Sequence, residues 1–160
     1  MQPVTIICVG RLKDAFFEEA SAEYLKRLKP YAKMNTVEIK QAPLSEAPSQ
    51  TEIDRALEAE GAEIIRKIPS NSTVIAMCIE GKQFSSEDFS RVFTEAALSG
   101  RAGVTFVIGG SCGLSERVKR MADIKMSMSK MTFPHRLARI MLLEQIYRAF
   151  KIASGEKYHK

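Results

Sequence analysis

Apolar residues follow two alternating patterns along the chain. Short runs rich in β-branched residues predict strands, at residues 4–9, 36–41, 73–79, 104–108 and 124–128. Between them, apolar residues recur at helical spacing, in the segments 14–28, 51–68, 85–98, 115–121 and 134–153. Strands that alternate with helices predict an α/β fold, with a mostly parallel sheet covered by helices on both faces.

Proline and glycine residues separate these segments. Pro30 and Pro69 follow the first two helical segments, and the stretch 42–50 is predicted to be a loop because it holds two prolines and two serines. The apolar run at 73–79 is expected to end at the sequence Glu-Gly-Lys (80–82). The chain shows no internal repeat and no linker, which favours a single domain.

Composition is that of an ordinary globular protein. The 160 residues (17.9 kDa) are 45% hydrophobic and 27% charged, so we expect residues 1–160 to form one compact domain. No stretch approaches the ~18–20 apolar residues that a membrane span requires. The N-terminal residues have no charged segment before their apolar run, so they are predicted to be a strand rather than a signal peptide, in a cytoplasmic protein.

Cysteine and histidine residues are few and scattered. Cys8, Cys78 and Cys112 show no CxxC spacing, and only His135 and His159 accompany them. A structural zinc ion takes four such ligands, and an odd number of unpatterned cysteines argues against a disulfide framework. We therefore expect neither a bound metal nor disulfide bonds.

Positive charge is concentrated in the last third of the chain. Residues 104–160 hold 11 Lys and Arg against 4 Asp and Glu, a net of +7, whereas residues 1–103 have a net of −2. A polarised positive field suits a polyanionic partner such as a nucleic acid. The alternative is a solvated basic face without a partner.

Two loops that follow strands carry the candidate chemistry. In the first, at 106–118, a strand runs into Gly-Gly-Ser-Cys-Gly (109–113) and then into a helix. Glycines allow a ligand to approach the backbone closely; the alternative is a tight turn without a ligand. The dinucleotide fingerprint GxGxxG after the first strand and the P-loop sequence are both missing, which disfavours nicotinamide and phosphate-cradling sites.

The second loop, at 126–135, again joins a strand to a helix, which Pro134 opens. Its serines, threonine and backbone carbonyls offer hydrogen bonds, while its methionines and Phe133 offer an apolar wall. This mixture suits a ligand that has a polar part and a planar apolar part. The alternative places the methionines in the core.

The last predicted helix is apolar on two sides. One sector contains Ala138, Leu142, Leu143, Ile146, Ala149, Phe150 and Ala153, and a second contains Leu137, Ile140, Met141, Tyr147 and Ile152. A single sheet face cannot bury both sectors, so we expect a partner subunit to cover one of them. Arg139 falls within the first sector, either as an ion-paired structural residue or as a residue that reaches a ligand or phosphate.

The C-terminal sequence Gly-Glu-Lys-Tyr-His-Lys (155–160) combines aromatic and basic residues. Such residues stack on bases and hold phosphates in RNA-binding proteins. The alternative is a polar chain end that frays.

The loop 106–118, the segment 127–152 and the tail 155–160 together resemble the ribosomal RNA large subunit methyltransferase H family. That family belongs to the SPOUT superfamily of S-adenosylmethionine-dependent RNA methyltransferases. The resemblance covers the whole chain and is most specific over residues 106–160. It implies an α/β fold with a C-terminal trefoil knot, a homodimer, and methylation of N3 of a pseudouridine in large-subunit (23S) ribosomal RNA.

The resemblance also implies where S-adenosylmethionine binds. The family's cofactor positions correspond here to Met77, Gly109, Met128, Ser129, Lys130, Met131, Thr132 and Phe133. Methionine stands at 77 and 128 where relatives often have leucine, which is a conservative apolar replacement. The tail of the family, Tyr-His-Lys or Tyr-His-Arg, is matched by Tyr158, His159 and Lys160.

We expect the tail and Arg139 to act on the RNA. N3–H of a pseudouridine lies between two carbonyls and is weakly acidic, so the site must accept its proton and hold N3 in line with the methyl carbon. We predict that Tyr158 orients the base, His159 accepts the proton and Lys160 holds a phosphate. Arg139 is predicted to contact the RNA or the developing anion, and His135 is predicted to be structural.

Two other classes of function remain open. A non-enzymatic ribosome- or RNA-binding factor explains the basic segment and the doubly apolar helix, but not two glycine- and serine-containing loops after successive strands. A nicotinamide-dependent enzyme predicts binding of NAD, which the position of the glycine loop disfavours. Binding of S-adenosylmethionine separates these classes.

Overall fold

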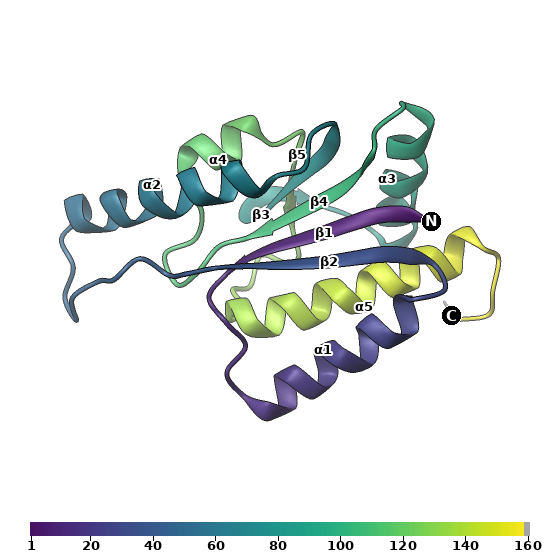
Figure 1. Cartoon of the computed structure of the whole chain (residues 1–160), viewed down its shortest axis with the longest axis horizontal. Coiled ribbons are helices and arrows are strands. Elements are labelled where there is room, and N and C mark those ends of the chain that lie inside the picture. The colour runs from purple at the N-terminus through teal and green to yellow at the C-terminus, as the bar shows by residue number, and fades with distance from the viewer. Residues whose placement is uncertain (159–160) are drawn as a thin grey trace.

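Five parallel strands form a sheet in the computed structural model, which describes residues 1–158 (Figure 1). The strands are β1 (Gln2–Val9), β2 (Ala32–Ile39), β3 (Ser72–Gln83), β4 (Gly103–Ile108) and β5 (Ile124–Ser127). The helices are α1 (Ala15–Leu28), α2 (Gln50–Lys67), α3 (Ser86–Leu98), α4 (Glu116–Met121) and α5 (His135–Ala153). The strand order is β2-β1-β4-β3-β5. The predicted α/β fold with a parallel sheet is confirmed.

Helices cover both faces of the sheet (Figure 1). Successive strand residues point to opposite faces: Val4 and Ile6 belong to the core beneath α1, α3 and α5, and Ile7 and Val9 belong to the core beneath α2 and α4. The central strand β4 is buried along its whole length. Burial on both faces explains why the strand segments read as continuous apolar runs.

Serine side chains cap three helices. Ser49, Ser85 and Ser115 each accept a hydrogen bond from the backbone N–H three residues later, which satisfies one donor that a helix start leaves free. The start of α3 thus agrees with the prediction from the sequence. None of the helices in the described part of the chain is long and apolar enough to cross a bilayer.

The edge strand β2 begins and ends earlier than predicted. It spans Ala32–Ile39, whereas the sequence pattern predicts 36–41. β2 pairs with all of Gln2–Val9 in continuous register. Because the full length of β1 is available for hydrogen bonding, the strand continues over Lys33 and Asn35, whose side chains are exposed.

β3 is longer than predicted, and the expectation that residues 80–82 close it is wrong. The strand continues to Gln83. Its pairing with β5 shifts between Met77 and Lys82, which both lie opposite Met126. The residues between them form a bulge, which the local sequence alone does not reveal.

α5 is the central helix of its layer, since it packs against both α1 and α3. Leu142 and Ile146 are fully buried beneath the sheet. Ile140 and Tyr147, which belong to the second apolar sector of the sequence pattern, also pack against this core. The chain itself therefore covers part of the sector that was expected to need a partner, whereas Leu137 remains 36% exposed.

Candidate active site

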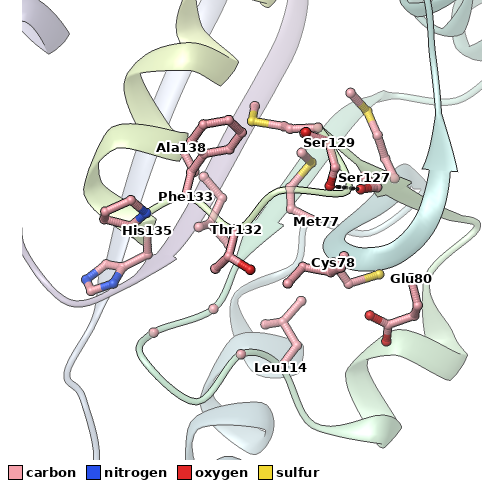
Figure 2. Close-up of a pocket in the computed structure, with 18 of the residues that line it drawn as sticks. Met77, Cys78, Glu80, Leu114, Ser127, Ser129, Thr132, Phe133, His135 and Ala138 are labelled. Atoms are coloured by element: carbon pink, nitrogen blue, oxygen red, sulfur yellow. Dashed lines mark hydrogen bonds between the residues drawn. The ribbon is translucent and has the colours of Figure 1, made fainter.

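A pocket of about 790 Å³ lies at the carboxyl edge of the sheet (Figure 2). Its walls come from the bulged part of β3 (77–80), the turn after β4 (108–114), the loop after β5 (126–134) and the first turn of α5 (135–138). Ligand sites in open α/β sheets lie at this edge. Because β4, β3 and β5 are neighbours in the sheet, the segments that follow them converge on one place.

Gly109 begins the turn after β4 and has no room for a side chain. A Cβ atom there would lie 2.3 Å from the carbonyl oxygen of Gly113 and 2.4 Å from its carbonyl carbon. The N–H of Gly113 donates to the carbonyl of Gly110 at 3.1 Å, and Gly113 has a φ of +79°, which favours glycine. Gln41 Nε2 donates to Ser111 Oγ at 3.0 Å and fixes the tip of the turn. The turn therefore exposes backbone atoms to the pocket at a position without a side chain.

The bulge in β3 forms the wall across from α5. Figure 2 shows Cys78 and Glu80 on this side of the pocket and His135 on the other. Gly81 makes the bulge possible, because a Cβ atom there would lie 2.6 Å from the backbone nitrogen of Met126. The close approach of two backbones at this point turns the preceding residues toward the pocket.

The titratable side chains of the pocket are held in defined states. Lys119 Nζ lies 2.5 Å from a Glu80 carboxylate oxygen, and this hydrogen bond keeps the pKa of Glu80 below its ordinary value. Burial raises the pKa of the Cys78 thiol. Burial and the charge of Arg136 lower the pKa of His135, so its ring is neutral at pH 7. Within residues 1–158, no group of His, Cys, Asp and Glu side chains is arranged to hold a metal ion.

Hydrogen bonds within the loop after β5 hold its shape. Ser127 Oγ donates to the carbonyl oxygen of Ser129 at 2.9 Å, and Ser129 Oγ accepts from the N–H of Met131 at 3.0 Å. Thr132 and Phe133 follow and line the pocket (Figure 2). One stiff loop therefore offers both hydroxyl groups and an aromatic ring to a ligand.

The pocket collects seven of the eight residues to which the family resemblance gives a cofactor role. They are Met77, Gly109, Met128, Ser129, Met131, Thr132 and Phe133. The eighth, Lys130, is exposed and is not a lining residue. Other lining residues were not predicted from the sequence to belong to the site, among them Cys78, Glu80, Lys119 and Ala138, and His135 was predicted to be structural. The one signal for the missed β3 residues was Gly81 beside an apolar run, which is typical of a bulge.

Arg139 lies beside the pocket rather than in it. Its side chain is 8% exposed, and its Nη1 atom lies 2.9 Å from Glu38 Oε1. It lines a separate small cavity at the end of β1. The ion pair corresponds to the structural alternative of the sequence analysis, and a contact with RNA stays a prediction.

The described end of the tail folds back onto α5. Tyr158 Oη donates to a Glu144 carboxylate oxygen at 2.9 Å. Its ring meets Tyr147 edge-on, with 4.9 Å between centroids, and the guanidinium carbon of Arg148 lies 4.7 Å from the ring centroid. Tyr158 does not line the pocket. His159 and Lys160 lie outside the described residues, so their roles stay predictions.

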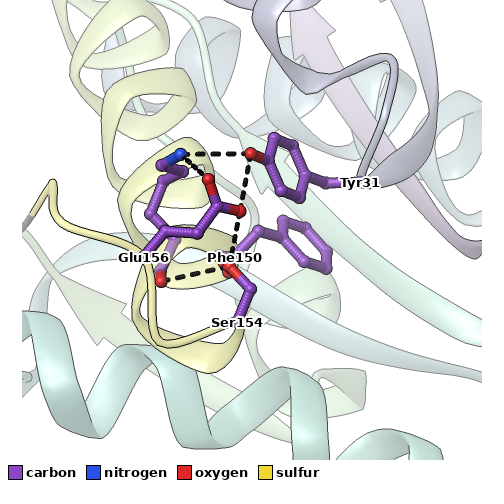
Figure 3. A network of polar contacts seen from close by, with 5 residues as sticks. Tyr31, Phe150, Ser154 and Glu156 are labelled. Atoms are coloured by element: carbon purple, nitrogen blue, oxygen red, sulfur yellow. Dashed lines mark hydrogen bonds and ion pairs between the residues drawn. The ribbon is translucent and has the colours of Figure 1, made fainter.

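A second set of polar contacts holds the beginning of the tail (Figure 3). Glu156 accepts from Tyr31 Oη and Ser154 Oγ, both at 2.9 Å, and forms an ion pair with Lys151. Lys151 also donates to Tyr31 Oη at 3.1 Å. These contacts lower the pKa of Glu156 and raise that of Lys151. The tail is thus joined at two places to the body of the protein.

Comparison with known proteins gives the family. A family model described as "Predicted SPOUT methyltransferase" matches residues 2–159, and the chain belongs to this family. It is 47% identical to Ribosomal RNA large subunit methyltransferase H of Carboxydothermus hydrogenoformans and 46% identical to the protein of the same name of Clostridium acetobutylicum. Each of these matches covers 98% of this chain and 99% of the relative. The family resemblance found in the sequence is confirmed.

A solved structure shows a similar fold. A probable methylase family protein from Haemophilus influenzae Rd KW20 aligns with a TM-score of 0.53, over 98% of this chain and 70% of that chain. The two sequences are 13% identical. At this level the likeness concerns the fold alone.

Proposed function

We propose that this protein transfers the methyl group of S-adenosylmethionine to N3 of a pseudouridine in large-subunit ribosomal RNA, in the cytoplasm. The observation that carries the proposal is the convergence of the segments after β3, β4 and β5 on one pocket, at the positions of the family's cofactor site. Relatives 46–47% identical over nearly their full length are named as methyltransferases of this RNA. The basic C-terminal segment provides the charge that binding to RNA requires.

The residues of the pocket fit S-adenosylmethionine. Its volume of about 790 Å³ lies within the range of ~300–1,000 Å³ that is usual for ligand sites. The turn at Gly109 leaves backbone groups within reach of a planar base, and Phe133 adds an apolar surface. Met77 and Met128 supply polarisable contacts. A site made of these groups needs no phosphate-binding loop, in agreement with the missing nucleotide-binding motifs.

Methyl transfer makes two demands on the side chains around the pocket. S-adenosylmethionine supplies a methyl group on a positively charged sulfur atom. The protein must hold N3 of the base roughly 3–3.5 Å from that carbon and accept the N3 proton. Because Glu80 is paired with Lys119, we assign the acceptance of the N3 proton to His159. In this assignment Tyr158 orients the base, Lys160 holds a phosphate and Arg139 supports the RNA.

A homodimer is part of the same proposal. One stripe of α5 lies opposite its buried residues and consists of Leu137, Met141, Glu144, Arg148 and Ile152. Each of these side chains keeps some exposure in a single chain, although three of them are apolar. A second copy packed on this stripe would bury them together with the tail at Tyr158.

Family membership also supports the expected C-terminal trefoil knot. Such a knot is an exception to the usual rule for chain connections, and we expect it where the segment after β5 passes the loops of the pocket. We further infer that residues 1–160 act as one SPOUT-like domain, since the family match spans residues 2–159.

The function is tested with labelled S-adenosylmethionine and ribosomes that lack the modification. We expect label on N3 of one pseudouridine of the large-subunit RNA, found by mapping the labelled nucleotide. A non-enzymatic factor would bind the ribosomes without binding S-adenosylmethionine, and a nicotinamide enzyme would bind NAD instead. If calorimetry detects no binding of S-adenosylmethionine, the proposal is wrong.

Binding of the cofactor is expected to weaken in acid through His135. The pKa of this residue is lowered by burial and by Arg136, so the ring gains its proton only below its ordinary pKa of about 6.5. A second positive charge then opposes the sulfonium ion by about 1 kcal/mol, or about fivefold in affinity. S-adenosylhomocysteine, which has a neutral sulfur, should lose less affinity.

Titration of both ligands by calorimetry between pH 7.5 and 5.5 measures this difference. His135→Gln, which cannot gain the charge, should make the two ligands respond alike. An equal acid response of both ligands in the unaltered protein would contradict the prediction.

A further inference from the structure

Three arginine side chains gather around two carboxylates where β1 passes into α1. Arg139 and Arg11 both face Glu38, at 2.9 Å and 4.0 Å. Arg136 Nη1 lies 3.0 Å from Asp14 Oδ2. Because three guanidinium groups share two carboxylates, the cluster carries an excess of positive charge that an anion can neutralise.

This cluster adjoins the pocket. Its three arginines line the small cavity at the end of β1. Ile108 and His135 line that cavity as well as the pocket, so the two spaces lie side by side. An RNA strand that places a base in the pocket must carry its backbone past the neighbouring surface. Apart from Lys119, these three arginines are the lysine and arginine residues that line the two spaces.

Two of the arginines keep donors for a ligand. Arg136 Nε is buried and has no hydrogen-bond partner in the part of the chain that the structure describes. A buried donor without an acceptor is rare in folded proteins, because it loses its bond to water. The side chain of Arg11 is 83% exposed, and its 4.0 Å pair with Glu38 is long. Arg139, in contrast, is buried and closely paired.

We propose that Arg11 and Arg136 bind a backbone phosphate of the RNA strand whose base enters the pocket, while Arg139 positions Glu38 and, through it, Arg11. The inference rests on the proposed function and names the surface that holds the substrate. Guanidinium groups suit this task, since their planar N–H groups match the oxygens of a phosphate. Contacts of this kind set the register of the strand and carry a large share of its affinity.

Arg11→Gln tests the proposal with little risk to the fold, because the side chain is largely exposed. Binding to ribosomes that lack the modification is measured at several potassium chloride concentrations. We expect the dissociation constant for ribosomes to rise about tenfold. In a plot of log Kd against the logarithm of the salt concentration, the slope should fall by about one. The affinity for S-adenosylmethionine and kcat at saturating ribosomes should change less than twofold.

Arg66→Gln is the matched control. Arg66 is also exposed and paired, with Glu63 at 2.7 Å, but it lies at the end of α2 on the other face of the sheet. The Arg66→Gln variant should leave the affinity for ribosomes and the slope of its salt dependence unchanged. Arg136→Lys, which keeps the charge but removes Nε, should weaken binding to ribosomes several-fold.

The outcomes separate the two levels of inference. If Arg11→Gln and Arg66→Gln bind ribosomes alike while both transfer methyl groups, the phosphate site is wrong and the proposed function stands. If the unaltered protein transfers no methyl group to ribosomal RNA, the proposed function fails and the phosphate site fails with it.

Discussion

Replacing Gly109 with alanine is expected to lower the affinity for S-adenosylmethionine by about 30-fold or more. The new Cβ atom would lie 2.3 Å from one backbone atom of Gly113 and 2.4 Å from another. The backbone at residues 109 and 113 cannot move apart to a normal contact distance without opening this short turn. Overpacking costs about 2 kcal/mol, which corresponds to about 30-fold in a dissociation constant. Isothermal titration calorimetry measures the effect.

Gly110→Ala adds the same carbon atom at the neighbouring residue and serves as the control. Its Cβ would meet Val9 Cγ1 at 3.1 Å, which is the end of a side chain and can give way. We expect its affinity to stay within about threefold of the original protein, since Val9 needs to shift by only a few tenths of an ångström. Circular dichroism checks that both variants fold. Equal affinities for the two variants would show that the turn at Gly109 does not form the cofactor site.

The elements of the fold were predictable because local chemistry decides them. Val104–Ile108 is apolar at nearly every position, and the structure buries this strand on both faces. A helix was predicted over residues 85–98, and Ser85 does cap α3 at this point. These signals lie within a few residues of the structure that they specify.

The shape of the pocket was less predictable, because contacts between distant residues decide it. The bulge in β3 depends on the close approach of Gly81 to the backbone of Met126, far along the chain. The pair between Glu80 and Lys119 joins two elements in the same way. Hydrophobic periodicity reports which face of an element is buried, but not which distant backbone lies against it. The knot was expected only from the family resemblance, since periodicity carries no information on chain threading.

Removal of residues 158–160 is expected to abolish methyl transfer while leaving the affinity for S-adenosylmethionine within a few-fold. Tyr158 is held by its hydrogen bond to Glu144. On the α5 helix, the side chain of Glu144 points about 180° away from that of His135, which lines the pocket. Tyr158 is therefore held on the side of α5 that faces away from its own pocket. We infer that the tail serves the pocket of the second copy in the proposed homodimer.

Mixing two impaired variants tests this arrangement, with S-adenosylmethionine kept near the dissociation constant of the original protein. At that concentration the pocket of Gly109→Ala is mostly empty although its tail is intact, whereas the truncated chain fills its pocket but has no tail. In a mixed dimer, the tail of the first can reach the intact pocket of the second. Random exchange between two-fold symmetric dimers should restore about a quarter of the normal number of active sites.

The restored activity depends on action between subunits, because neither chain holds both parts of a site. Two different affinity tags identify the mixed dimer, and each variant alone provides the background. Mixed dimers that bind S-adenosylmethionine but remain inactive would show that the tail acts within its own chain. In that case the contacts of Tyr158 with Glu144 and Arg148 must open for the tail to reach the pocket, and Glu144→Gln would raise the rate of methyl transfer.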